Sequence, residues 1–406
     1  MTRTIQDLHG ALAKAAASAP LALALQQLNL GLSLKSDGVT FFDYQAEGAS
    51  AVTVAINTTQ STWQETFNKH PKPGFQSFGA LYRLNNEFEI TAPALELAQA
   101  LPTLEALLSS ARNILHHESL DWRNTDDLSQ LTGHYVKSGE DWIYYEMAGQ
   151  ADKPVICMLH TAGADSRQWH GLMTMPALLE DWQMISFDMP GHGRSPLPNG
   201  YPNWQWQLSE VQYVQTVRAF IQNQVRQRVV LMGCSMGAAI GLPLLGQHPE
   251  LFHAGILLET PYHSPGRRSS FLDHPLVHGG RLSATWVSSL LSPFSPMWRR
   301  NQASWIYSQS APSVYDGDLA FYSDEFKAIN HTANIDINKT PLWLLTGDYD
   351  YSASPNDTQR VADEIPGCVF KTMPGFGHFP MTEDPDRLVQ MHLAPILSQL
   401  HQQLLS

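Results

Sequence analysis

Cysteine is scarce in this 406-residue chain: there are only three, Cys157, Cys234 and Cys368. They are too few and too scattered for a disulfide framework or a zinc cluster. Basic residues are also outnumbered, with 25 Lys and Arg against 38 Asp and Glu, which gives a formal net charge of −13. An acidic chain without a long Lys/Arg run is poorly suited to nucleic acid or to anionic membrane surfaces. The expected partner is therefore a small, apolar or aromatic molecule.

Long hydrophobic runs are missing as well, since no stretch reaches the roughly 18 uncharged apolar residues that a membrane helix needs. An apolar run at residues 15–25 is preceded by Asp7 and interrupted by Pro20, and no small-residue cleavage site follows it. Together with the few cysteines, this predicts a cytoplasmic protein without a membrane segment. Hydrophobic residues make up 43% of the chain and charged residues 16%, which excludes disorder as its main state.

The chain has no internal repeat and is of a length that suits two domains. Residues 1–130 mix strand-like and helical runs and are predicted to form an accessory α+β domain. Leu21, Leu25, Leu28 and Leu32 are spaced as on a helix. Further strands are expected at 39–44, 51–56, 75–84 and 88–90, and further helices at 59–69 and 93–115. A polar stretch at 116–133 is the expected connection.

Residues 131–406 have a different rhythm, in which short apolar runs bounded by Gly, Pro or Asp alternate with helical segments. Such runs are typical of strands buried on both faces, and hence of a largely parallel sheet. The expected strands lie at 155–159, 184–187, 229–232, 255–258, 342–345 and 369–373. The interval 262–338 breaks the alternation with Pro, Ser and aromatic residues, and is predicted to be an inserted cap.

One serine is placed as a nucleophile would be. Residues 233–237 read Gly-Cys-Ser-Met-Gly, directly after the strand-like 228–232 and before a predicted helix at 238–247. This context indicates a nucleophile elbow, in which Ser235 sits in a strained turn and its neighbours must be small. The N–H of Met236 then lies at a helix N-terminus, aimed at a developing oxyanion.

A nucleophilic serine needs a base, and the base needs an orienting acid. His378 lies on a glycine-flanked loop after the last predicted strand. Asp348 and Asp350 follow the strand at 342–345, and in an extended segment both would face the same side. The residues themselves therefore leave two candidates for the acid.

Four segments together resemble the α/β-hydrolase family: residues 188–195, 233–237, 347–350 and 377–378. The resemblance covers roughly residues 135–404 and implies a mostly parallel sheet with an inserted helical cap. It also implies Asp350 as the acid, and a structural role for the Gly-His-Gly-Arg-Ser turn that ends the first of these segments.

The same resemblance places an oxyanion loop at residues 160–163, where this chain reads His-Thr-Ala-Gly instead of the family's His-Gly. Either Thr161 or Ala162 then donates the second amide, and by position we favour Ala162. The N-terminal residues, in turn, are similar in the order of their elements to sterol-carrier-protein-type lipid-binding domains. Their role is left open between a wall of the substrate entrance, a dimerisation surface (hence a possible homodimer), a capture module for apolar ligands, and a simple shield.

The substrate region is predicted from the aromatic content of the insert and from the residues after the oxyanion loop. We expect Trp298 and Trp305 of the insert, with Arg167 and Trp169 after the loop, to contact substrate. Arginine pairs at 267–268 and 299–300 could meet a substrate carboxylate, but we favour the interpretation that they are solvated surface pairs. His274 and His278 have a metal-ligand spacing, but Pro275 lies between them and no glutamate motif accompanies them, so no metal site is predicted.

The predicted activity is hydrolysis of a carboxylic ester of an apolar or aromatic molecule through an acyl-enzyme, without a metal or organic cofactor. A serine at the elbow argues against haloalkane or epoxide chemistry, for which the family uses aspartate. Hydrolysis of a carbon–carbon bond by the same triad is the nearest alternative, and thioesterase and lactonase activities are also compatible. A non-catalytic ligand-binding protein is the alternative from another functional class.

Overall fold

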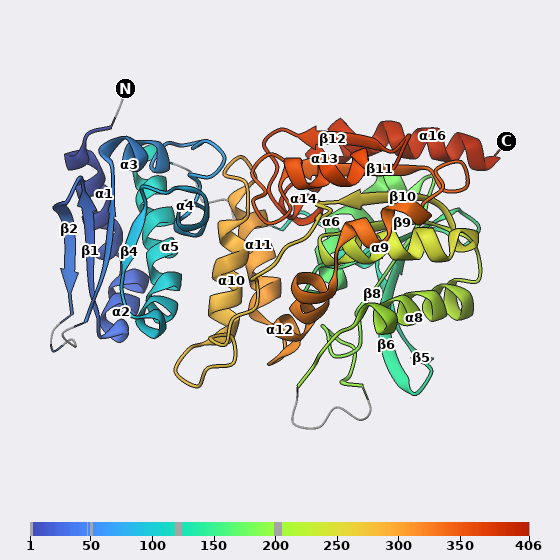
Figure 1. The fold of residues 1–406 in the computed structure, drawn as a ribbon, viewed down its shortest axis with the longest axis horizontal. Coiled ribbons are helices and arrows are strands. Elements are labelled where there is room, and N and C mark those ends of the chain that lie inside the picture. The colour runs from blue at the N-terminus through green and yellow to red at the C-terminus, as the bar shows by residue number, and fades with distance from the viewer. Residues whose placement is uncertain (1–2, 47, 49–51, 118–123, 199–204, 406) are drawn as a thin grey trace.

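The N-terminal part of the chain folds around a core of its own (Figure 1). The protein is described by a computed structural model that covers residues 3–46, 48, 52–117, 124–198 and 205–405. Four strands form one sheet in the order β2-β1-β3-β4, where β1 and β3 are parallel and the other pairs antiparallel. In chain order the elements are α1 (Ile5–Ala16), α2 (Ala19–Leu28), β1 (Gly31–Ser36), β2 (Val39–Gln45), β3 (Thr53–Thr58), α3 (Gln60–Thr66), α4 (Phe78–Leu84), β4 (Glu89–Thr91) and α5 (Ala94–His116).

Two expectations for this part are wrong. The predicted strand at 75–84 is instead the helix α4, because the Ser77 side chain accepts a hydrogen bond from Ala80 N and caps it, while Phe78 and Leu81 lie on its buried side. The leucine spacing also predicted a helix that extends further than the one in the structure. Helix α2 ends at Leu28, Asn29 adopts a left-handed conformation, and Leu32 belongs to β1.

The second sheet has eight strands in the order β12-β11-β10-β9-β7-β8-β6-β5, and its six neighbouring strands from β12 to β8 are parallel. Apolar clusters cover both of its faces. All six runs predicted as strands are strands, which confirms the expected fold class. Bounds are β5 (Thr132–Ser138), β6 (Asp141–Ala148), β7 (Val155–Leu159), β8 (Gln183–Phe187), β9 (Val229–Cys234), β10 (Phe252–Leu258), β11 (Leu342–Gly347) and β12 (Val369–Met373).

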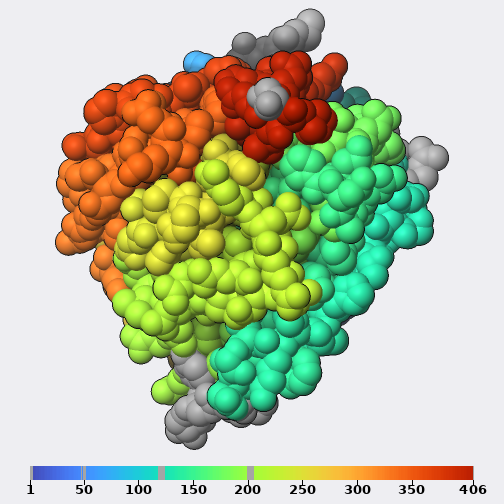
Figure 2. Space-filling view, turned by 90° about the vertical axis from the view of Figure 1, so that its right-hand side faces the viewer, coloured from blue at the N-terminus to red at the C-terminus, as the bar shows by residue number. Residues whose placement is uncertain are grey.

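Helices flank this sheet and fill the insert. Figure 2 shows the face turned away from the N-terminal sheet, where the C-terminal helix (red) lies above the yellow-green 210–250 segment and beside the teal first strands. The helices are α6 (His170–Met173), α7 (Pro176–Leu179), α8 (Glu210–Phe220), α9 (Met236–Gln247), α10 (Gly279–Ser289), α11 (Met297–Ser308), α12 (Val314–Leu319), α13 (Pro355–Asp363), α14 (Pro380–Glu383), α15 (Pro385–Leu388) and α16 (Ala394–Leu405).

The insert lies between the two sheets. Helices α10, α11 and α12 all fall between β10 and β11 in the chain, and α10 packs against both α4 and α5 of the N-terminal part (Figure 1). Among the described residues no single helix has the length and composition of a membrane span, although α1 and α2 pass that test jointly across an 86° bend.

Candidate active site

The turn between β9 and α9 presents Ser235 above the carboxyl edge of the sheet. Ser235 has φ 55° and ψ −111°, a conformation that L-residues rarely adopt. The close approach around it requires glycines: a Cβ on Gly233 would lie 2.3 Å from Gly237 O, and one on Gly237 would lie 2.5 Å from Leu159 O. The strained turn is held by the sheet, since Ser235 N donates to Leu258 O at 2.9 Å.

A chain of two hydrogen bonds runs from this serine to a buried carboxylate. His378 Nε2 lies 2.8 Å from Ser235 Oγ, and His378 Nδ1 lies 2.6 Å from Asp350 Oδ2. Asp350 Oδ1 accepts from the backbone N–H groups of Ser352 at 2.6 Å and Ala353 at 3.2 Å. With Nδ1 donating to Asp350, Nε2 is left as the acceptor for the serine proton, which is the arrangement a general base requires.

The structure separates the two candidate acids. Asp350 contacts His378, whereas Asp348 Oδ1 accepts from Gly375 N at 2.7 Å and is half-buried. Burial alone would raise the pKa of Asp350, but the charge and hydrogen bond of His378 lower it overall. The acid that faces the imidazole is therefore the one kept ionised.

Glu259, which the sequence analysis did not consider, lies directly behind Asp350. It is fully buried at the end of β10, has φ 54°, and both of its carboxylate oxygens accept from Gly347 N, at 3.0 and 3.1 Å. Burial and the adjacent charge of Asp350 raise the pKa of Glu259 well above its usual range, which favours the protonated form, and that form can donate to Asp350. The sequence did contain a signal for Glu259, because this acid directly follows a buried strand, as Asp348 and Asp350 do.

Four neighbouring parallel strands thus carry Ser235, Glu259, Asp350 and His378 at their carboxyl ends, in the order β9, β10, β11, β12. Glu259, Asp350 and His378 bring possible metal-ligand atoms within 4.8 Å of one another. Both ring nitrogens of the histidine, however, already face Asp350 and Ser235. The cluster therefore has the bonding pattern of a proton relay and leaves no imidazole nitrogen for a metal.

The loop after β7 supplies an amide beside Ser235. Thr161 N donates to Gln168 Oε1 at 3.1 Å, and Gly163 N donates to Asp318 Oδ2 at 2.7 Å, so the amides on both sides of Ala162 are occupied. No acceptor for Ala162 N–H is found among the described residues, and Ala162 borders the same cavity as Ser235. Of the two alternatives, only the Ala162 N–H is unbonded among the described residues, and its role as an oxyanion donor stays a prediction. Met236, the first residue of α9, has an N–H without an intrahelical acceptor.

A buried cluster of hydrogen bonds around Asp318 holds this loop in place. Besides Gly163 N, Asp318 accepts from His192 Nε2 and Trp206 Nε1, both at 2.7 Å. Burial lowers the pKa of His192, but Asp318 more than compensates and raises it overall. Asp318 lies on α12, so the insert anchors both the oxyanion loop and the turn that contains His192.

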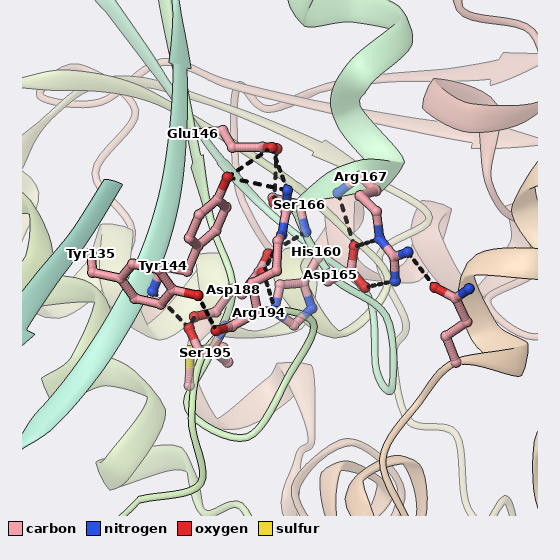
Figure 3. Close-up of polar contacts among 12 residues, drawn as sticks. Tyr135, Tyr144, Glu146, His160, Asp165, Ser166, Arg167, Asp188, Arg194 and Ser195 are labelled. Atoms are coloured by element: carbon pink, nitrogen blue, oxygen red, sulfur yellow. Dashed lines mark hydrogen bonds and ion pairs between the residues drawn. The ribbon is translucent and has the colours of Figure 1, made fainter. Parts of the chain in front are cut away.

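The turn at residues 191–195 belongs to a second network (Figure 3). Ser195 Oγ donates to Asp188 O at 2.6 Å and accepts from Tyr144 N, while Arg194 contacts Glu146 and donates to Ser166 Oγ at 2.6 Å. These bonds tie β6 and the end of β8 to the segment after the oxyanion loop. This agrees with the structural role implied for the turn.

A cavity of about 390 Å³ opens onto Ser235, Ala162 and His378. Its size and mainly apolar lining are typical of a small-molecule site. Side chains from the N-terminal part, the insert and the sheet edge share the wall, among them Phe78, Leu97, Phe271, Trp286, Tyr315 and Tyr322. The N-terminal members were missed because no local pattern tells which distant helix will cover a sheet edge.

None of the four residues expected to contact substrate is among the described residues that line this cavity. Trp169 is fully buried in the apolar core below. Arg167 is paired with Asp165 at 2.6 Å, and its guanidinium lies over the ring of Trp305, which is 52% exposed. Trp298 stacks against the guanidinium of Arg299. Those expectations are therefore corrected, and so is the surface interpretation of Arg299, which is buried and paired with Asp126 at 2.6 Å.

The N-terminal part also bonds to the loop that holds Asp350. Gln76 Nε2 donates to Tyr349 O at 3.2 Å, and Tyr349 OH donates to Pro71 O at 2.5 Å. One residue further, Tyr351 OH lies 2.6 Å from Ser289 Oγ of α10. The two residues that flank Asp350 are thus held by contacts to segments outside the sheet.

Comparisons with known proteins show similarity in sequence and in fold. Residues 158–391, more than half of the chain, match a profile of the alpha/beta hydrolase family. RutD of Pseudomonas syringae pv. syringae, named for carbamate hydrolysis, is 23% identical over 58% of this chain and 90% of its own length. A pimeloyl-[acyl-carrier protein] methyl ester esterase of Aeromonas hydrophila is 30% identical over 26% of this chain, a match that spans only 38% of the esterase. The crystal structure of the enol-lactonase of Burkholderia xenovorans LB400 superposes with a TM-score of 0.58 at 18% identity, covering 65% of this chain and all of that one.

Proposed function

This chain belongs to the alpha/beta hydrolase family, and from that premise we propose that it is a serine hydrolase which cleaves carboxylic esters of apolar or aromatic small molecules. The observation that carries the proposal is the unbroken chain of hydrogen bonds from Ser235 Oγ through His378 to Asp350, at 2.8 and 2.6 Å. Its serine end opens onto a mainly apolar cavity. The esterase among the relatives supports ester chemistry, although its match to this chain is partial.

Acylation begins when Ser235 Oγ attacks the ester carbonyl carbon and His378 Nε2 takes the Oγ proton. The carbonyl π pair moves to oxygen, and the resulting oxyanion is held by the N–H groups of Met236 and Ala162. Loss of one such donor typically costs about 2.7–4 kcal/mol of barrier. Collapse of the intermediate breaks the bond to the alcohol, which leaves with the proton from Nε2.

Deacylation repeats these steps with water. His378 takes a proton as the water oxygen bonds to the acyl carbon, and the acid is released when Ser235 Oγ leaves and regains that proton. Asp350 keeps Nδ1 protonated and stabilises the imidazolium in both halves of the cycle. Its buried carboxylate is held by backbone donors, so little reorganisation accompanies each proton transfer.

The apolar wall explains the proposed substrate class. Aromatic and aliphatic side chains surround Ser235, and they gain most from an equally apolar acyl or alcohol group. We further propose that the insert acts as a cap, and that the first 116 residues serve as a wall of the substrate site. Among the roles considered for them, this one is supported by Phe78 and Leu97, which lie on the same cavity as Ser235.

The test is hydrolysis of p-nitrophenyl esters from acetate to palmitate by wild type, S235A and S288A, the last being an exposed serine on α10. We expect wild type and S288A to turn over at least one ester and S235A to lose nearly all activity. No turnover on any ester would favour carbon–carbon bond hydrolysis or a ligand-binding role. Turnover that survives in S235A would refute the assignment of the nucleophile.

A further inference from the structure

Two arginines from distant parts of the chain line the cavity that contains Ser235. Arg83 lies on α4 of the N-terminal part, and Arg267 lies in the insert. Arg83 Nη2 donates to Gly266 O at 3.5 Å, and Arg267 Nη2 donates to Tyr351 O at 3.4 Å; both bonds are long. Arg267 Nε is buried without a hydrogen-bond partner among the described residues. Two guanidinium groups therefore line one cavity with most of their donors unused.

Neither arginine pairs with a carboxylate within the part of the chain that the structure describes. The adjacent Arg268 differs, since Asp316 lies 2.7 Å and Asp324 3.3 Å from its guanidinium. Partial loss of solvent and the like charge of Arg267 lower the pKa of Arg83. Arg267 is half-buried and Arg83 is exposed, so the pair presents uncompensated positive charge to a mainly apolar cavity, and an anion bound there would pair with it.

The pair lines the same cavity as Ser235, and Tyr322 lies on the wall of that cavity as well. Burial raises the pKa of the Tyr322 hydroxyl, and the positive charge of Arg267 offsets part of that rise. That hydroxyl has no hydrogen bond of good geometry among the described residues, although the side chain is 98% buried. Tyr315 is also on the cavity wall within the field of both arginines. A ligand reaching from Ser235 to the arginines would thus meet further hydroxyl donors on the way.

We propose that the cavity takes esters carrying an oxyanion at the end remote from the scissile bond, and that Arg267 and Arg83 bind this oxyanion. The proposal rests on the proposed ester hydrolysis and adds the substrate class to it. Guanidinium forks suit carboxylate and phosphate alike, through paired N–H···O bonds. Because Arg83 belongs to α4, the N-terminal part supplies one half of the subsite, which gives it a role in specificity as well as in enclosing the cavity.

The experiment compares charged and neutral esters of matched shape. On the acyl side these are mono-p-nitrophenyl adipate, p-nitrophenyl 5-phosphonopentanoate and p-nitrophenyl hexanoate; on the alcohol side they are 4-acetoxybenzoate and its methyl ester. We expect wild type to favour a charged member over its neutral partner by about tenfold or more in kcat/KM, as expected for charge-assisted hydrogen bonds. The carboxylate and phosphonate arms identify the preferred oxyanion.

The variants R267M and R83M should each reduce this charged-to-neutral ratio by about tenfold, and R267K should retain part of it because the charge remains. R281M, an exposed arginine on α10, is the matched control and should keep the wild-type ratio. A ratio near one in wild type, or a ratio that R267M and R83M leave unchanged, would overturn the inference while ester hydrolysis stands. Thermal melts check that each variant is folded. If R267M does not fold, R267K takes its place in the comparison.

A binding measurement separates this inference from the proposed activity. Adipate and hexanamide are titrated calorimetrically into S235A and into the double variant S235A/R267M. Adipate binding that depends on Arg267 supports the anion subsite even if no ester is hydrolysed, and in that case only the proposed activity fails. Equal binding of the charged and neutral ligands to S235A would refute the subsite.

Discussion

Asp348 and Asp350 are separated by a single residue but bond to different partners. Asp350 accepts from His378 Nδ1, whereas Asp348 accepts from the backbone of Gly375. D350N should lower kcat by about 10²–10⁴-fold, because the amide no longer enforces the required imidazole tautomer. D348N should lose much less. Ester hydrolysis by the two variants, measured side by side, checks this, and the reverse ranking would show that Asp348 is the functional acid.

Glu259 permits a second test at the same scale. The raised pKa favours a protonated Glu259 that can donate to Asp350, and a glutamine amide can donate as well, so E259Q should keep kcat/KM within about tenfold of wild type. E259L removes both that donor and the acceptor for Gly347 N–H, and should destabilise the fold by about 1–3 kcal/mol. Urea unfolding and ester kinetics measure the two effects. Loss of activity in E259Q as severe as in D350N would mean that Glu259 acts as a carboxylate.

Local motifs identified Ser235, His378 and both candidate aspartates, because each lies beside glycines or directly after a strand, and both features are visible in the sequence. The structure brings three of these residues together, and their catalytic roles stay a prediction. The residues that line the cavity could not be predicted from the sequence. Trp169 and Trp305 look alike as aromatic residues, yet one is fully buried in the core and the other faces solvent over Arg167. Tertiary packing alone decides which aromatic side chains line the cavity.

At the scale of elements, Glu383 joins the histidine loop to the insert. Its carboxylate accepts from Ser292 N at 2.8 Å, Ser295 Oγ at 2.9 Å and Phe379 N at 3.1 Å. Burial raises the pKa of Glu383 from 4.5 to about 7. The folded state therefore binds more protons than the unfolded state between these two values, and the free energy of unfolding falls as pH rises through this window.

We expect this loss to be absent in E383Q, which cannot ionise. For one group the slope is at most about 1.4 kcal/mol per pH unit. Urea midpoints at pH 5, 6, 7 and 8 for wild type and E383Q measure it, and the difference between the two proteins isolates Glu383 from the other titrating groups. A difference that stays constant with pH would show that Glu383 is ionised throughout.

The elements themselves were unevenly predictable. Strands buried on both faces, such as β7 and β9, appear as unbroken apolar runs and were found from the sequence. Helix α4 was not found, because its seven residues are rich in side chains that also suit strands, and capping by Ser77 together with packing on α10 decides the conformation. Short elements follow their tertiary contacts more than their own propensity.

At the scale of the whole molecule, the N-terminal part is docked against the insert and the Asp350 loop. Gly79 marks the closest approach, since a Cβ there would lie 2.8 Å from Ser289 Oγ and 3.1 Å from Tyr351 OH. G79V should push α4 away from α10 and lower kcat/KM for esters by about tenfold or more, since small displacements near a site cost rate steeply. Gly10 on α1 has open space around its Cβ position, so G10A is the matched control.

G10A should leave ester kinetics unchanged and stabilise α1 by about 0.5–1 kcal/mol, because alanine favours helix over glycine. Steady-state kinetics and thermal unfolding of the two variants give both readouts. Unchanged kinetics in a folded G79V would mean that the docking of α4 does not shape the site.

The central claim is that Ser235 is the nucleophile of this hydrolase, and covalent labelling tests it most directly. Wild type is treated with a fluorophosphonate, and intact mass spectrometry followed by peptide mapping locates the adduct. We expect a single adduct, on the peptide that contains Ser235, which is lost in S235A and forms much more slowly in H378A. No adduct, or an adduct that S235A retains, would contradict it.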